Sequence, residues 1–65
     1  MNLEEFVGKK VRIFTEKSEY IGKVIGYTQA IDNEPEVASI DVRNEADKTL
    51  YELYENEIKG IEVLN

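Results

Sequence analysis

Basic side chains interleaved with aromatic rings are the groups in this sequence whose types and spacing could perform recognisable chemistry. Lysine and arginine contact phosphates and aromatic rings stack on bases, so this mixture is typical of surfaces that bind single-stranded nucleic acid. A structural interpretation competes with it, because exposed lysines protect sheet edges and tyrosines commonly form half-buried walls. The basic residues are Lys9, Lys10, Arg12, Lys17 and Lys23, and the rings between them are Phe14, Tyr20 and Tyr27.

Catalytic groups are scarce in this chain. The sequence contains no histidine and no cysteine, which excludes triads built on imidazole, disulfides and Cys/His zinc sites. Ser39 is a hydroxyl on an expected strand with no base nearby in the sequence. General acid–base catalysis usually needs tuned groups in a concave pocket, which a core this small rarely encloses. We therefore predict a protein that is not an enzyme and that has no catalytic residues and no cofactor.

Three carboxylates crowd into one expected loop, at Asp32, Glu34 and Glu36. Oxygen ligands of this kind suit a hard cation such as Ca²⁺. The segment lacks the glycine and the bidentate glutamate spacing of the EF-hand loop, which favours a solvated acidic loop. No metal site is predicted.

The distribution of charge limits the partners of the chain, whose net charge is −6. Residues 1–23 carry five basic and four acidic side chains, whereas residues 24–65 carry three basic and ten acidic ones. Phosphate backbones and anionic lipids are bound through lysine and arginine, so an acidic domain is poorly suited to DNA or to a membrane surface. The local basic strip leaves RNA as a possible but disfavoured partner.

The length of 65 residues predicts a single domain, 1–65, with a small core and no disulfide or zinc to strengthen it. Association with a protein partner or with a second copy is therefore expected. The absence of cysteine fits the reducing cytoplasm, and the N-terminal residues lack the basic and apolar segments of a signal peptide. We predict a cytoplasmic protein.

Alternating apolar and polar residues predict five short strands. Gly22 and Gly26 are expected to mark bends or bulges in the second strand. In the third strand, Ile40 and Val42 share the core face and Ser39 lies on the polar face with Asp41 and Arg43. The expected elements are a short helix over 3–7, strands over 9–15, 20–30, 37–43, 49–54 and 58–64, and a tight or 3₁₀ turn at 55–57.

Turns spaced by roughly ten residues suit an all-β fold, and five strands are too few for a sandwich. The prediction is an all-β, five-stranded SH3-like barrel with a small N-terminal helix. Closure into a barrel would remove exposed sheet edges. A five-stranded OB-fold stays an alternative, because its sequence signals overlap with those of the SH3-like barrel.

The order of these features resembles the Sm-like (LSm) family of SH3-like barrels across nearly the whole chain. The segments 7–13 and 22–24, followed by Tyr27, look like the first Sm motif, and 58–64 looks like the second, with Lys59-Gly60 where the family usually has Arg-Gly. The resemblance implies a barrel, assembly into a ring or edge to edge, and an RNA pocket. The positions equivalent to the aspartate and asparagine of that pocket are Thr28 and Asp32, and the Asp32 carboxylate would repel phosphate.

Two functional hypotheses result. The leading one is a non-enzymatic interaction module that associates with itself or with a protein partner through strand edges and aromatic side chains, since aromatic residues dominate interface energetics. Its candidate residues are Phe14, Tyr20, Tyr27, Tyr51 and Tyr54. The alternative is a divergent Sm-like RNA-binding protein, whose candidate residues are Lys9, Lys10, Arg12, Lys23, Tyr27 and Lys59.

Overall fold

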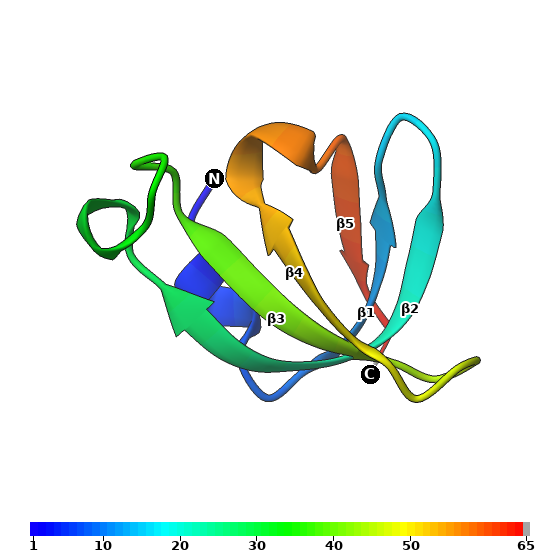
Figure 1. Cartoon of the computed structure of the whole chain (residues 1–65). Helices are drawn as coiled ribbons and strands as arrows, with labels where there is room; N and C mark the ends of the chain where they lie inside the picture. The colour runs from blue at the N-terminus through cyan, green and yellow to red at the C-terminus, as the bar shows by residue number, and fades with distance from the viewer. Residues whose placement is uncertain (65) are drawn as a thin grey trace.

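Five antiparallel strands form one sheet in the order β4-β3-β2-β1-β5 (Figure 1). The computed structural model describes residues 1–64. Each expected strand is present with slightly different bounds, so the all-β prediction is confirmed. The strands are β1 (Lys10–Phe14), β2 (Glu19–Thr28), β3 (Ser39–Asn44), β4 (Leu50–Tyr54) and β5 (Gly60–Val63).

Helical structure within residues 1–64 is limited to three short 3₁₀ turns, η1 (Leu3–Phe6), η2 (Ala30–Asp32) and η3 (Glu55–Glu57). The expected N-terminal helix is therefore one 3₁₀ turn, and Gly8, at φ +88°, turns the chain towards β1 in the left-handed conformation that glycine adopts at low cost. The turn expected at 55–57 is confirmed as η3. None of these turns is long or apolar enough to cross a bilayer.

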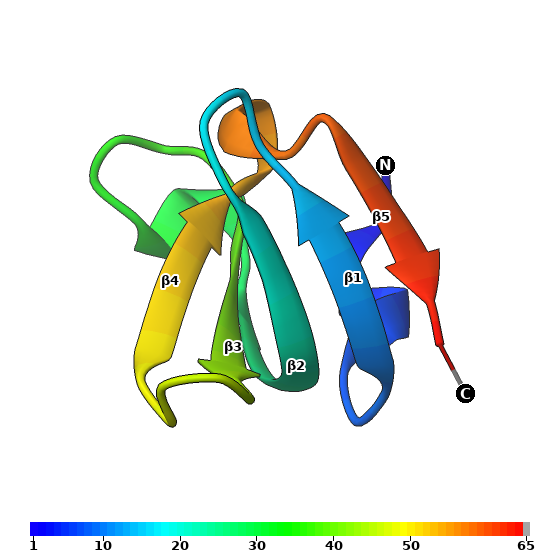
Figure 2. The same cartoon turned by 90° about the vertical axis from the view of Figure 1, so that its right-hand side faces the viewer.

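The sheet is open between β4 and β5, which are not paired with each other in the described part of the chain. Figure 2 places these two strands at opposite sides of the view, with β1 and β2 between them. The chain leaves β4 through η3, and β5 then pairs with β1, with Ile61 opposite Ile13. The closed barrel that the sequence predicts is therefore not formed by backbone hydrogen bonds, and the sheet keeps two edges.

The core lies on the concave side of this sheet and follows the predicted alternation. Val11 and Ile13 of β1 and Ile40 and Val42 of β3 are all buried, and η1 adds Leu3, of which 1% is exposed. The full set of buried apolar residues is Leu3, Val11, Ile13, Val24, Ile40, Val42, Leu53 and Ile58.

Two glycines of β2 allow the sheet to bend, as predicted. Gly22 lies so close to β3 that a Cβ atom there would overlap the carbonyl oxygen of Arg43. The register between β2 and β3 shifts between Val24 and Gly26, which is a β-bulge. Bulges increase the local twist and bend the strand, so this irregularity helps the ten-residue β2 to curve around the core.

Candidate functional site

The outer strand β5 leaves backbone groups unpaired along one edge of the sheet. Leu64 donates a hydrogen bond to the Lys10 carbonyl at 2.8 Å. Residues in antiparallel pairs alternate between hydrogen-bonded and non-hydrogen-bonded positions. The backbone amide and carbonyl of Glu62, two residues before Leu64, therefore also point towards β1. The amide and carbonyl groups of Ile61 and Val63 consequently point away from β1 and are available to another strand.

The opposite edge of the sheet is β4, whose pattern follows from the same alternation. The Glu55 backbone amide donates to the Ala38 carbonyl at 2.8 Å. The backbone amide and carbonyl of Leu53, two residues earlier, therefore also point towards β3. Leu50 and Glu52 then direct their backbone groups away from the sheet. Both edges of the sheet can therefore accept a further strand.

The two edges differ in their side chains. On β5, Val63 is 42% exposed and the following Leu64 is 38% exposed, while Ile61 is half-buried. On β4, Leu50 is 50% exposed, but the exposed neighbour that shares its free edge is the carboxylate residue Glu52. Charged side chains on an edge discourage pairing with another chain, and each edge strand carries one, Glu52 on β4 and Glu62 on β5. Only on β5 do both residues with outward-facing backbone groups, Ile61 and Val63, carry apolar side chains.

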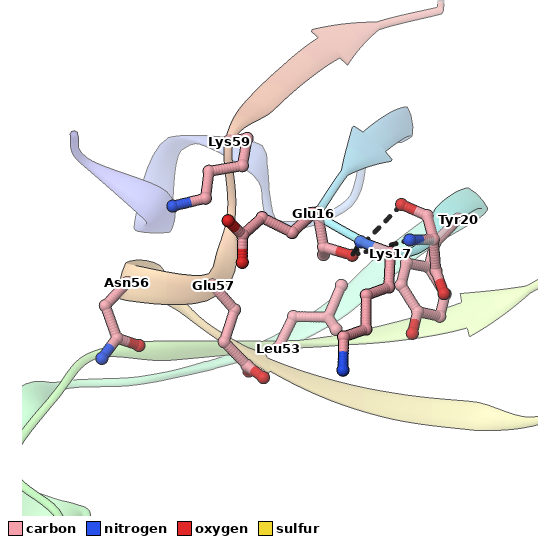
Figure 3. A pocket seen from close by; sticks show the side chains of 9 residues that line it. Glu16, Lys17, Tyr20, Leu53, Asn56, Glu57 and Lys59 are labelled. Carbon is pink, nitrogen blue, oxygen red and sulfur yellow. Dashed lines mark hydrogen bonds between the residues drawn. The ribbon is translucent and has the colours of Figure 1, made fainter.

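A recess of about 410 Å³ opens between the β1–β2 turn and η3 (Figure 3). The buried Leu53 and the half-buried Tyr20 supply its apolar wall. Its rim carries charges of both signs, including Lys17, Glu57 and Lys59. The recess therefore combines an apolar wall with a rim of charged side chains.

The aromatic residues predicted for protein interaction do not form one surface. Tyr20, Tyr27 and Tyr51 pack against the core, and the ring centroids of Tyr20 and Tyr51 lie 4.9 Å apart at an angle of 56°. Tyr54 is half-buried at the end of β4, and Phe14 is 41% exposed on the outer face of β1. These three core-facing rings therefore match the structural interpretation, in which tyrosines form half-buried walls.

The structure also separates most of the residues predicted for RNA binding. Arg12 lies between two glutamates, with its Nε 3.3 Å from Glu19 and its Nη1 3.4 Å from Glu62. Its Nε makes no hydrogen bond, so the contact with Glu19 is ionic only. Two nearby carboxylates offset the charge that Arg12 would offer to a phosphate.

The remaining members of that set lie on different parts of the fold. Lys9 is exposed just before β1, Tyr27 faces the core, and Lys59 lines the recess beside η3. Only Lys10 and Lys23 come together, directly opposite each other on β1 and β2. RNA binding stays a prediction, without a single assembled site to support it.

Ser39 corrects the expectation of an exposed polar face on β3. Only 1% of this residue is exposed, because the loop before β3 covers it. Its Oγ donates to Glu52 Oε2 at 2.9 Å and accepts from Asn33 Nδ2 at 3.0 Å, and the same Asn33 amide donates to the Val37 carbonyl at 2.8 Å. The hydroxyl therefore ties the loop to the sheet and is not accessible to a substrate.

The turn between β3 and β4 contains a short hydrogen bond between a tyrosine and a carboxylate. The Tyr51 hydroxyl donates to Asp47 Oδ2 at 2.6 Å, and the Thr49 amide donates to Asp47 Oδ1 at 2.9 Å. The bond from Tyr51, followed by that from Thr49, lowers the pKa of the Asp47 carboxyl. The same bond to Asp47 raises the pKa of the Tyr51 hydroxyl.

The Tyr51→Phe variant is expected to lose stability between about pH 4 and pH 10, the range between the ordinary pKa values of aspartate and tyrosine. A lowered carboxyl pKa stabilises the fold above the ordinary value and is lost as the pH falls through the lowered one. A raised hydroxyl pKa stabilises it below pH 10 and is lost as the pH rises. The difference in free energy of unfolding between wild type and variant should therefore shrink at both extremes.

Urea unfolding at a series of pH values, followed by circular dichroism, measures this difference. Tyr27→Phe is the matched control, because the Tyr27 hydroxyl has no hydrogen-bond partner among residues 1–64. A Tyr51→Phe difference that stays constant across the pH range would contradict the assignment.

Two features that sequence reasoning missed are Arg43 and Lys48. Arg43 on β3 lies directly opposite Lys23 on β2. Lys48, in the turn after β3, lines the same recess as Lys10, Lys23 and Arg43. The sequence indicates which residues of each strand lie on its polar face. It does not indicate which residues of neighbouring strands lie opposite each other.

Within residues 1–64, no group of three histidine, cysteine, aspartate or glutamate side chains is arranged to hold a metal ion. In the acidic loop, Asp32 accepts a hydrogen bond from Gln29 Nε2 at 2.9 Å. Comparisons with protein-family models, with curated proteins and with solved structures find no match to this chain. The resemblance to Sm-like proteins therefore rests on the sequence pattern alone.

Proposed function

We propose that this protein is a non-enzymatic interaction module that associates through the free edge of β5, with a second copy of the chain as its partner. The observation that carries the proposal is the pair of outward-facing backbone positions at Ile61 and Val63. Both side chains are apolar, and neither position carries the charge or proline that protects sheet edges in monomeric proteins.

The geometry of this edge supports a symmetric antiparallel pair. Ile61 of each copy would lie opposite Val63 of the other, so the free amides and carbonyls of both positions would be satisfied. Glu62 would then face its own equivalent across the axis. Arg12 Nη1 lies 3.4 Å from the Glu62 carboxylate and would partly offset the repulsion between the two carboxylates.

We also propose that the sheet belongs to the SH3-like class of small barrels, with its gap between β4 and β5. The strand order and the 3₁₀ turn between the last two strands support this assignment. In such a barrel the gap leaves edges that a second chain can extend, which is the recognition mode called β-augmentation.

A proline at Val63 tests the proposed association. Val63→Pro removes an amide that faces away from β1, so the internal ladder should survive while the intermolecular pairing is lost. Light scattering coupled to size-exclusion chromatography should give wild type about twice the chain mass of 7.5 kDa, and the variant the mass of one chain. Val63→Thr keeps the amide and should remain dimeric.

Leu50→Pro is the matched control on the other edge, because Leu50 also directs its amide away from the sheet. It should leave the dimer intact if association uses β5. A wild type that stays monomeric at the highest soluble concentration, or a Val63→Pro variant that remains folded and dimeric, would overturn the proposal. Circular dichroism of each variant establishes that it is folded.

A further inference from the structure

Three basic side chains form a row across the outer face of three neighbouring strands. Lys10 of β1 lies opposite Lys23 of β2, and Lys23 lies opposite Arg43 of β3. The Val24 amide donates to the Lys9 carbonyl, so the next pair, Lys10 and Lys23, occupies a non-hydrogen-bonded position. Side chains approach most closely at such positions. Like charges that face each other in this way destabilise a sheet.

Lys48 adds a fourth positive charge from the turn between β3 and β4. Its φ of 61° lies in the left-handed region, which non-glycine residues seldom adopt, and its amide donates to the Asn44 carbonyl at 2.9 Å. Together with Gly8, Asn44 and Glu45, the four basic residues line a recess of about 340 Å³. We call this recess, with Lys10, Lys23, Arg43 and Lys48, the basic recess.

The charges of the basic recess are only partly compensated. Glu45 Oε2 lies 2.8 Å from Lys10 Nζ. In the part of the chain that the structure describes, no carboxylate forms an ion pair with Lys23, Arg43 or Lys48. Among the described residues that line the basic recess, four are positively charged and one is negatively charged, in a chain whose net charge is −6.

Protection of sheet edges does not account for this arrangement. Lysines that prevent aggregation are found on edge strands, whereas the row runs over β1, β2 and β3, which each have a neighbour on both sides. Like charges at directly opposite positions lower the stability of the fold unless an anion lies between them. The placement of these residues is what a site for a compact, multiply charged anion requires.

We propose that the basic recess binds a phosphate group, either as inorganic phosphate or as a phosphate monoester. The Arg43 guanidinium offers a planar pair of donors that matches two phosphate oxygens, and the ammonium groups of Lys23 and Lys48 add point charges. Glu45 holds Lys10 at the rim of the recess. This site is independent of the β5 edge and of any association through it.

Phosphate titration at constant ionic strength tests this site, with chloride as the balancing anion. Inorganic phosphate should raise the melting temperature of wild type and shift the backbone amide NMR signals of the β3–β4 turn and of Lys23. Lys23→Gln and Arg43→Gln should each weaken binding about tenfold or more, since hydrogen bonds to charged groups are among the strong ones. Lys17→Gln, the same change in the β1–β2 turn, should bind like wild type.

A second measurement separates a lost binding site from a damaged fold. Without phosphate and at low salt, Lys23→Gln should melt at a higher temperature than wild type, because it removes the repulsion from Lys10 and Arg43.

Parallel titrations with O-phosphoserine and with inorganic phosphate distinguish a monoester from the free anion, and specific binding of either supports the site. A wild type that responds to neither beyond chloride, or a Lys17→Gln variant that loses as much affinity as Lys23→Gln, would overturn the proposal.

Discussion

Replacing Gly22 with alanine is expected to lower the free energy of unfolding by about 3 kcal/mol or more, at the upper end of the usual cost of overpacking. The added Cβ would overlap the Arg43 carbonyl oxygen and lie 2.8 Å from the Arg43 carbonyl carbon. Both atoms belong to the backbone of β3, which is paired on both sides. Relief would therefore require β2 and β3 to separate where they cover the core.

The size of this effect matters because the whole fold has little stability to lose. Natural domains have about 0.05–0.15 kcal/mol per residue, which for a chain of this length is roughly 3–10 kcal/mol in total. A loss of about 3 kcal/mol would therefore remove between roughly a third and all of the stability of the fold. Urea unfolding followed by circular dichroism, or the dispersion of the amide NMR spectrum, measures the loss directly.

Gly60→Ala is the matched control for this prediction. A Cβ at Gly60 would lie 3.5 Å from Phe14 Cδ2, which is an ordinary van der Waals contact. This variant should stay within about 1 kcal/mol of wild type, because the change also restricts the unfolded chain. If Gly22→Ala kept the stability of wild type, the close approach of β2 to β3 would be wrong.

The strands could be predicted because their pattern is local. The alternation around Val11 and Ile13, and around Ile40 and Val42, sets the face of each strand without knowledge of its neighbours. The bulge at Gly26 was also indicated locally, since a glycine within a strand commonly marks such an irregularity. Predicting these elements requires only the residues that lie next to one another in the sequence.

The candidate sites could not be predicted in the same way, because they depend on pairing between distant segments. Arg12 is neutralised by Glu62, which is 50 residues away. The basic recess depends on the register of β2 against β3, and the bulge shifts that register. Ser39 is buried by Asn33 from the preceding loop. None of these contacts follows from the composition or spacing of one segment.

The openness of the sheet is a further feature that strand patterns do not encode. The sequence predicts five strands and a tight or 3₁₀ turn at 55–57, but the same elements fit either a closed or an open sheet. Within the described residues, η3 joins β4 to β5, and β5 pairs with β1 and not with β4. The pairing of Gly60–Val63 with β1 leaves both edges free, and the proposed association uses one of them.

The second large effect is expected at Leu3, which links the N-terminal turn to the core. Leu3→Ala should lower the free energy of unfolding by about 3 kcal/mol, within the range for truncating a buried leucine. Leu3 is 1% exposed, and η1 contacts both β2 and β3. The lost methyl groups would leave a cavity that the sheet, with its pairing fixed, can only partly fill.

Val7→Ala is the control for Leu3, because Val7 belongs to the same N-terminal segment but is 44% exposed. Exposed substitutions of this kind usually change stability by less than about 0.5 kcal/mol. Urea unfolding of both variants distinguishes two roles for the N-terminal turn. If Leu3→Ala costs no more than Val7→Ala, η1 opens without disturbing the core. If it costs the expected amount, η1 unfolds together with the sheet and is a structural part of the domain.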